Sequence, residues 1–286
     1  MKKTVIGILI VLLIAFVGYF IIYPYDYIIR FEANTFPGTI NQSVKLWNKT
    51  AGVAGSPVVQ EDLYHLEQQV QAGDSVHIYN WEITPLTENS SKVTVRIKDR
   101  DHSWKNKLLV PFTESEVERS GIKHVSDFVN DLQDHIDLFK VQIEGEAEMP
   151  STFYAYVELK TDQHGKAGGM MDTYMMLSDV LVRNNVTLNG PPMILVDQWD
   201  RKTDSLEYRF CFPILRSDQL PQHPKIKYNR LFPKRALKAT YNRNYFTSDR
   251  AWYALLDYAE SQGIEVVETP VEVFFNNPHM GGDALR

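Results

Sequence analysis

The chain has 286 residues, a formal net charge of −6 and one cysteine, Cys211. Its length suits two domains of ordinary size. The acidic balance argues against nucleic acid as a partner, because phosphate binding needs a clustered basic surface. A single cysteine excludes an internal disulfide and a CxxC site, so we expect Cys211 to be a structural residue within a strand.

The N-terminal segment predicts a membrane anchor. Lys2 and Lys3 precede an uncharged, mostly apolar run that ends in a group of tyrosines. About 20 such residues can span a bilayer as a helix, and tyrosines favour its interfacial end. We expect residues 1–25 to form a single-pass anchor in a bacterial inner membrane, with residues 4–23 in the bilayer and the rest of the chain outside the cytoplasm. A cleaved signal peptide is the alternative, but the residues after the run are too bulky for a cleavage site.

Residues 26–148 are predicted to form a region of mixed strands and helices. Period-two alternation of apolar residues predicts strands, and a period of 3.6 predicts amphipathic helices. The longest element is a helix that starts near Glu114 and whose apolar stripe continues to Ile143. The other predicted elements are a strand at 27–33, a short helix at 40–47, paired strands at 76–83 and 92–97, and a third strand at 104–112.

This order of elements resembles the helix-grip fold of the SRPBCC, or polyketide-cyclase-like, superfamily. The opening residues that match are Phe31, Pro37, Val44 and Trp47, and the long helix closes the pattern. The resemblance implies that this helix covers a cup that holds apolar ligands. It indicates a fold rather than a particular chemistry.

The C-terminal half is predicted to contain an internal repeat, because residues of similar type recur at a constant offset. The offset is 78, as 237 − 159 = 78 shows for two leucines. Each copy is predicted as a strand, a loop, an amphipathic helix and two further strands. The corresponding pairs include Leu159 with Leu237, Tyr174 with Trp252, and Pro192 with Pro270.

The second copy resembles the GyrI-like, or AraC effector-binding, family. The residues that carry the resemblance are Leu237-Lys238-Ala239-Thr240-Tyr241, Tyr245, Trp252, Leu255, Gly263, Pro270, Val273-Phe274, Asn277-Pro278 and Leu285-Arg286. The first copy matches the family at Gly190-Pro191-Pro192 and Phe212-Pro213-Ile214. The family implies two βαββ units that pack face to face around a pocket for small, often lipophilic molecules. The strand that closes the second unit, with its usual carboxylate, has no counterpart before Arg286.

The predicted fold class is therefore α+β, in three parts. An N-terminal transmembrane helix (1–25) precedes an SRPBCC-like helix-grip domain (26–148). A duplicated βαββ GyrI-like domain follows (151–286), with its last strand apparently absent.

The candidate ligand-binding residues are aromatic and lie in the repeat. Pockets are lined by aromatic side chains with a few placed polar groups, and two related units leave a shared boundary where such side chains converge. We expect Trp252 to face this boundary and its neighbour Tyr253 to point outward. Glu207, Glu272 or Asp197 would supply a charge. The full set of predicted ligand-binding residues is Tyr241, Tyr245, Trp252, Phe274 and Tyr174.

The predicted function is binding of a small lipophilic or aromatic molecule by a membrane-anchored protein, without catalysis. The alternatives are a hydrolase of the GyrI-like type, which needs a pocket carboxylate, and a structural protein of the cell envelope. We expect no cofactor and no metal. His124 and His135 are interpreted as part of a solvated helix face, and residues 164–169 as a flexible loop, because neither fits a known ligand spacing.

Overall fold

The computed structural model describes residues 7, 8, 10, 11, 13, 14, 17–19, 22–50, 57–87, 89–109, 113–243 and 245–275. The chain divides into two compact units. Unit 1 comprises Met1–Leu86 and Ser90–Gln133, and unit 2 comprises Thr87–Asn89 and Asp134–Arg286. The predicted domain limits, 26–148 and 151–286, stay predictions.

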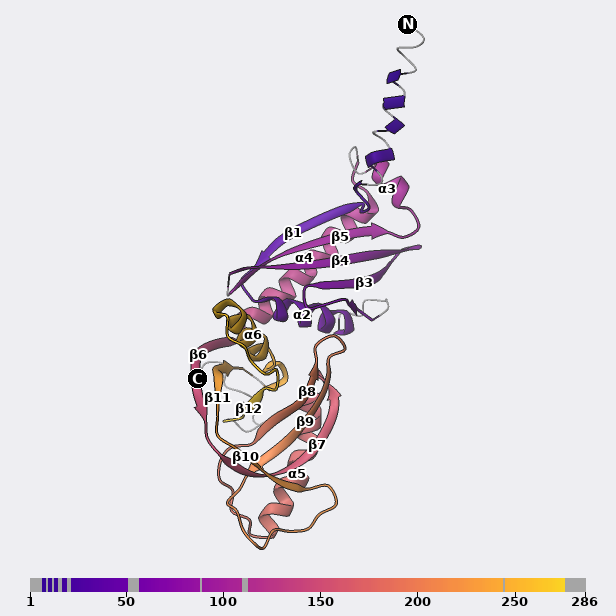
Figure 1. Ribbon diagram of the computed structural model, residues 1–286. Coiled ribbons are helices and arrows are strands. Elements are labelled where there is room, and N and C mark those ends of the chain that lie inside the picture. The colour runs from indigo at the N-terminus through magenta and orange to yellow at the C-terminus, as the bar shows by residue number, and fades with distance from the viewer. Residues whose placement is uncertain are drawn as a thin grey trace. The chain divides into compact units, whose positions relative to one another are not determined.

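Unit 1 contains a five-stranded antiparallel sheet in the order β1-β5-β4-β3-β2, of which β1, β5, β4 and β3 lie side by side in Figure 1. In β5 the inward residues Val93, Val95 and Ile97 alternate with more exposed polar residues, which is why this segment forms a half-buried strand. The strands are β1 (Tyr27–Ala33), β2 (Val59–Gln60), β3 (His65–Ala72), β4 (Ser75–Thr87) and β5 (Ser90–Asp99).

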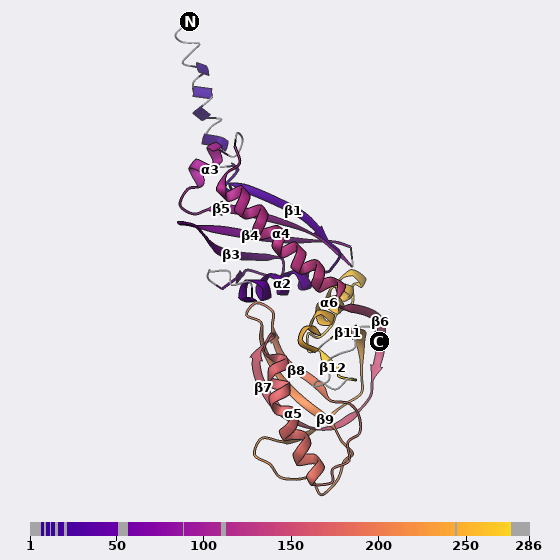
Figure 2. The same cartoon turned by 180° about the vertical axis from the view of Figure 1, so that it is seen from behind.

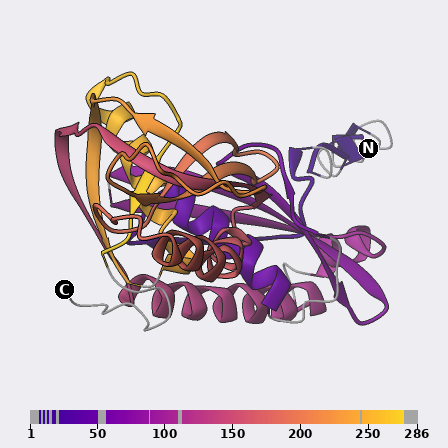
Figure 3. The same cartoon turned by 90° about the horizontal axis from the view of Figure 1, so that it is seen from below.

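Three helices accompany this sheet: α2 (Pro37–Thr50), α3 (Ser103–Leu109) and α4 (Glu116–Asp137). Helix α4 crosses the sheet in Figure 2 and is the long magenta helix of Figure 3. The Ser115 hydroxyl accepts the Glu118 N–H at 3.2 Å and caps its start. Phe128, on its buried face, lies 4.9 Å from Trp81, 5.6 Å from Trp47 and 6.4 Å from Phe31 between ring centroids. The core of unit 1 therefore joins α4 to the sheet and to α2.

Two sequence predictions in this region are wrong. The segment predicted as a strand at 104–112 is helix α3 in its described part. The long helix ends at Asp137 rather than near Ile143, and Lys140–Met149 forms strand β6. Within β6 every second residue is half-buried and the residues between them are exposed. Its apolar residues thus follow a period of two, which the helical interpretation of the stripe had overlooked.

Unit 2 contains a five-stranded antiparallel sheet in the order β10-β7-β9-β8-β12 and a two-stranded ribbon of β6 and β11. Helix α5 packs on one face of the larger sheet, where the Tyr174 ring lies 5.2 Å from the Phe212 ring. The remaining elements are β7 (Thr152–Asp162), α5 (Lys166–Arg183), β8 (Met193–Asp200), β9 (Ser205–Pro213), β10 (Lys227–Leu231), β11 (Lys234–Asn242), a 3-10 turn (Tyr245–Thr247), α6 (Arg250–Gln262) and β12 (Val271–Val273).

The ends of α5 and α6 are related by the sequence offset of 78. Each helix is followed by a residue in the left-handed conformation, Asn185 after α5 with φ 56° and Gly263 after α6 with φ 64°. These two residues are separated by the same offset, since 263 − 185 = 78. The hydrogen bond from Val186 N to Leu181 O, at 2.9 Å, has its counterpart from Ile264 N to Ala259 O, at 2.8 Å. The repeated sequence thus produces the same helix end twice.

The predicted fold class needs correction. The described strands form three antiparallel sheets, and β11, the first strand of the second copy, pairs with β6 rather than with β12. The described residues therefore do not form two self-contained βαββ units, because the strand β11 pairs with β6, a segment outside the repeat. The described residues do not support the predicted transmembrane helix either. A span needs about 20 consecutive helical residues, and the described residues include no helix long and apolar enough to cross a membrane. Nine residues of the predicted span (4–6, 9, 12, 15, 16, 20 and 21) lie outside the described part.

Candidate functional site

A buried ion pair between the start of α5 and strand β12 also contacts a residue that precedes α6. The Lys166 ammonium, at the first position of α5, donates to Ser248 Oγ at 2.8 Å and to Glu272 Oε1 at 2.7 Å. The Lys166 side chain is 0% exposed and that of Glu272 is 11% exposed. Ser248 Oγ also lies 2.9 Å from Glu272 Oε2. Because a buried charge is costly unless it is paired and hydrogen-bonded, these three residues hold one another in place.

Trp252 lies against this ion pair. The Lys166 ammonium stands 4.7 Å from the centroid of the Trp252 ring, in cation–π geometry. The Trp199 ring contacts Trp252 edge-on at 5.1 Å between centroids. Trp252 is 3% exposed, and its indole Nε1–H meets no hydrogen-bond acceptor among the described residues. Leaving such a donor buried and unpaired costs about 1–3 kcal/mol.

Gln163 forms a second link between the two helix starts. Its side-chain oxygen accepts from Trp199 Nε1 and from the Tyr253 hydroxyl, each at 3.0 Å. Its amide donates to Asp249 Oδ2 at 2.9 Å. Tyr253 is 1% exposed, so the prediction that it points outward is wrong. Its ring lies 5.2 Å from that of Trp199, which therefore contacts both Trp252 and Tyr253 of α6.

We call the group Gln163, Lys166, Trp199, Ser248, Trp252 and Glu272 the seam. It brings together one of the predicted aromatic residues, Trp252, and one of the predicted charges, Glu272. The other two predicted charges lie elsewhere, where Glu207 pairs with Lys160 at 2.6 Å and Asp197 pairs with Arg209. Phe274 lies two residues beyond Glu272 and is half-buried, and its N–H donates to Pro192 O at 2.9 Å.

The remaining predicted aromatic residues contact other groups. The Tyr245 hydroxyl donates to Met171 Sδ at 2.9 Å. Tyr174 packs on the aromatic face of β9, as described above. Tyr241 stacks on Phe139 at 5.7 Å between centroids, and its hydroxyl lies 2.6 Å from Thr247 Oγ1. Burial raises the pKa of Tyr241 to about 12, so it is neutral at physiological pH.

Lys166, Ser248 and Gln163 were not predicted as site residues, and the interpretation of residues 164–169 as a flexible loop is wrong for 166–169, which begin α5. One signal was present for Lys166. A cation in the first turn of a helix opposes the helix dipole, so a lysine there needs a specific partner. Its partner Glu272 lies 106 positions later in the chain, which the local pattern does not reveal.

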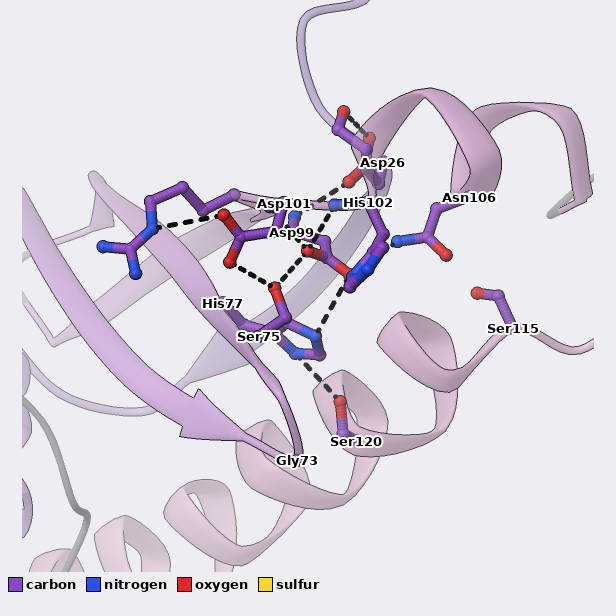
Figure 4. A network of polar contacts seen from close by, with 12 residues as sticks. Asp26, Gly73, Ser75, His77, Asp99, Asp101, His102, Asn106, Ser115 and Ser120 are labelled. Atoms are coloured by element: carbon purple, nitrogen blue, oxygen red, sulfur yellow. Dashed lines mark hydrogen bonds and ion pairs between the residues drawn. The ribbon is translucent and has the colours of Figure 1, made fainter.

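Unit 1 contains a separate polar network around Asp99, shown in Figure 4. Asp99 Oδ1 accepts from Ser75 Oγ at 2.5 Å and from the N–H groups of Asp101 and His102 at 3.0 and 2.9 Å. Asn106 donates to Asp99 Oδ2 at 3.0 Å. Burial acts to raise the pKa of Asp99, but these hydrogen bonds outweigh it and lower the pKa below its ordinary value.

His77 lies between this carboxylate and α4. Its Nδ1 is 3.1 Å from Ser120 Oγ, and its Nε2 is 3.7 Å from Asp99 Oδ2. Burial lowers the pKa of His77, so the ring is neutral at pH 7. Serine, histidine and aspartate are the residue types of a hydrolytic triad. However, 3.7 Å exceeds a hydrogen bond, and the hydrogen bonds of Asp99 fix the turn into α3. The network therefore serves to anchor that turn.

Comparison with known proteins gives only weak likenesses. No family of known proteins matches the sequence, and no curated protein does. Among solved structures, the cryo-EM structure of an EcmrR–DNA complex shares 14% identity over 61% of this chain and 63% of that chain, with a TM-score of 0.37. The crystal structure of the di-domain ARO/CYC StfQ from the steffimycin biosynthetic pathway shares 9% identity over 66% of this chain and 85% of that chain, with a TM-score of 0.21. At these scores the likenesses carry no argument about function.

Two sequence-based expectations change with these comparisons. The GyrI-like and SRPBCC resemblances are not confirmed, because the neighbours are too distant to show a family. The exclusion of nucleic acid does not hold, although the DNA of the first of these structures is a property of that complex alone. The physical reason is that a net charge of −6 sums over the whole chain and does not describe any local surface.

Proposed function

We propose that unit 2 binds a small, planar, uncharged aromatic molecule at the seam, with Trp252 as the principal contact. The observation that carries the proposal is the buried Trp252 Nε1–H without an acceptor. A ligand with a carbonyl or ether oxygen supplies that acceptor and recovers the cost of the unpaired donor. The flat indole face and the neighbouring Trp199 favour an aromatic ligand over an aliphatic one.

The charge of the seam supports an uncharged ligand. Lys166 and Glu272 neutralise one another, so the group as a whole offers no net charge to bind. Glu272 is held by Lys166 and Ser248, which favours binding over a reaction that needs this carboxylate to act on the ligand. Glu272 and Phe274 point to the same side of the chain as alternate residues, and both are half-buried, so access from solvent is expected beside them.

The indole N–H signals of the full-length protein test this proposal. The chain has five tryptophans, and the Trp252 signal is identified by its loss in Trp252→Phe. We expect 2-acetonaphthone, which has a carbonyl acceptor, to shift the Trp252 signal downfield. The Trp199 indole already donates to Gln163, so its signal is the internal reference.

A matched ligand isolates the hydrogen bond. 2-Ethylnaphthalene has a similar shape but no acceptor, so we expect it to bind about tenfold more weakly, the equivalent of one hydrogen bond. Trp252→Phe should reduce the preference for the ketone to less than about twofold. If neither compound moves the Trp252 signal up to its solubility limit, or if the two bind equally, the proposal fails.

A further inference from the structure

A second polar cluster of unit 2 lies on another part of the same helix start. It comprises His135, Arg243, Asp249 and Arg250, and we call it the arginine–histidine cluster. Arg243 Nη1 donates to His135 Nδ1 at 3.0 Å and approaches His135 O at 3.4 Å. Arg250 Nη1 donates to Asp249 Oδ2 at 3.0 Å. Residues from the end of α4, the end of β11 and the start of α6 thus meet here.

The contact with Arg243 fixes the tautomer of His135. A guanidinium can only donate, so Nδ1 must be the accepting nitrogen and Nε2 must carry the ring proton. Burial, together with the charges of Arg250 and Arg243, lowers the pKa of His135 to about 4. The imidazole is therefore neutral at pH 7 and presents one N–H donor at Nε2.

Two donors of the cluster lack partners. His135 Nε2 and Arg250 Nε are both buried and find no hydrogen-bond acceptor in the described part of the chain. Arg250 is 1% exposed, so its guanidinium has little access to bulk water. Each buried donor without a partner is costly, and a charged donor costs more than a neutral one.

The charges of the cluster do not balance. Arg243 and Arg250 bring two positive charges, whereas Asp249 brings one negative charge and is shared with Gln163. The two tyrosines that these arginines influence, Tyr241 and Tyr253, have pKa values raised by burial and are neutral. The cluster therefore carries one net positive charge at neutral pH. His135 and Arg243 are half-buried, which leaves a side open to a small solute.

We propose that the arginine–histidine cluster binds the oxyanion of a small molecule, a phosphate or a carboxylate group. Such a group accepts from His135 Nε2 and Arg250 Nε, and its negative charge balances the cluster. Hydrogen bonds between a guanidinium and an oxyanion are among the strong ones in proteins, because both partners are ionised. The site is separate from the aromatic contact at Trp252 and does not depend on the proposed function of the seam.

Histidine NMR of the full-length protein tests the site directly. The His135 ring signals are identified by their loss in His135→Gln. They are titrated in sodium chloride, sodium phosphate and sodium acetate at equal ionic strength. An anion at the cluster favours the imidazolium form, so we expect phosphate or acetate to raise the pKa of His135 by at least about one unit. A rise with phosphate alone assigns a phosphoryl ligand, and a rise with both assigns a general oxyanion site.

Phosphate affinity, measured by calorimetry, separates the cluster from general charge attraction. Arg243→Gln should weaken binding at least about tenfold. Arg235→Gln removes the same charge from β11, where Arg235 forms an exposed ion pair with Glu146 of β6, and should change the affinity less than about twofold. Arg243→Lys keeps the charge but lacks the planar fork, so an intermediate loss is expected.

Two results would overturn the proposal of an oxyanion site. One is a His135 pKa that is the same in all three salts. Another is an equal loss of phosphate affinity in Arg243→Gln and Arg235→Gln. Either result means that water or the protein itself satisfies the two donors. Trp252→Phe should leave phosphate binding unchanged, so failure of the seam proposal and failure of the oxyanion site are distinguishable.

Discussion

Glu272 and Ile194 lie directly opposite one another in the ladder between β12 and β8, and they are equivalent residues of the repeat, because 272 − 194 = 78. Hydrogen bonds on either side of this pair are equivalent as well. Phe274 N donates to Pro192 O at 2.9 Å, and Val196 N donates to Pro270 O at 3.0 Å. The two copies therefore meet along a local twofold axis that passes between Ile194 and Glu272.

The side chains at this axis have diverged. Ile194 is fully buried, whereas Glu272 reaches the Lys166 ammonium. Opposite residues of an antiparallel ladder project to the same face of the sheet, so one copy supplies an apolar group and the other a carboxylate to the same region. The charges beside this axis are thus asymmetric although the backbone pairing of β8 with β12 is symmetric, and this asymmetry gives Lys166 its partner.

The first prediction concerns the Lys166–Glu272 ion pair. Lys166→Met leaves the Glu272 carboxylate part-buried without its cation, so the free energy of unfolding should fall by about 3–5 kcal/mol. Adding Glu272→Leu should restore most of that loss, since an apolar pair replaces a buried charge. Urea unfolding followed by tryptophan fluorescence measures both. Lys160→Met, in the exposed pair with Glu207, is the control and should cost less than about 1 kcal/mol. A loss for Lys166→Met as small as the control's would contradict the prediction.

The second prediction contrasts two adjacent glycines of α5. A Cβ at Gly169 would lie 2.6 Å from the Tyr208 hydroxyl, which donates to Lys166 O at 2.9 Å and is buried. A Cβ at Gly168 meets nothing within 4 Å. Gly168→Ala should therefore raise stability by about 0.5–1 kcal/mol through helix propensity. Gly169→Ala should lower it by about 1–3 kcal/mol through overpacking.

Thermal unfolding of the two glycine variants checks the contrast. Tyr208→Phe removes the clashing oxygen, so in the Gly169→Ala background it should recover part of the lost stability. Equal effects of the two alanines would show that α5 does not approach β9 this closely.

The sequence predicted the elements with strong periodicity and failed where two periods overlap. The core strands with alternating apolar residues, such as β5, were placed correctly. The stripe of α4 and the alternation of β6 share Phe139 and Ile143 as candidates, so a helix was extended over a strand. Only pairing with β11, which lies more than 80 positions later, decides that 140–149 is extended.

The candidate site, too, was predicted only in part. Position within the repeat pointed to Trp252, because its equivalent Tyr174 also lies on a helix that packs on the sheet. The polar groups around Trp252 come from a helix start, a strand and two loops that lie far apart in the chain, and their residue types are ordinary for such positions. Glu272 was one of three candidate charges, and nothing local distinguished it from Glu207 and Asp197. The contact with Lys166 distinguishes Glu272 from the other two carboxylates, and the burial of Lys166 is seen only in the folded structure.

The third prediction is a pH dependence of unit 1 through His124. Burial lowers the pKa of His124 to about 4, from the ordinary 6.5. Its ring lies between Trp47 and Tyr79, at 4.4 and 4.6 Å between centroids. Because the folded pKa is depressed, the contribution of this group to stability is present above pH 6.5 and is lost as the pH falls from 6.5 towards 4. His124→Phe should make the unfolding midpoint less sensitive to pH in that window. Urea denaturation of both proteins at pH 7 and at pH 5 measures this sensitivity. If the midpoint of His124→Phe changes between pH 7 and pH 5 as much as that of the parent protein, the depressed pKa of His124 is contradicted.

The last prediction concerns Asp257, on α6. Burial and, secondarily, the charge of Glu260 raise the pKa of Asp257 to about 7, from 3.8, and its Oδ2 has no partner among the described residues. A raised folded pKa means that the group favours folding below pH 3.8, and that this contribution is lost as the pH rises through 7. Asp257→Asn keeps the size and removes the ionisation, so it should stabilise the protein at pH 8 and have a smaller effect at pH 5. Glu260→Gln, one turn later on the exposed side, removes only the secondary cause and should give a smaller stabilisation at pH 8. Urea midpoints at the two pH values measure all three proteins. An Asp257→Asn variant that is less stable than the parent at pH 8 would show that the carboxylate is paired and ionised, and would refute the raised pKa.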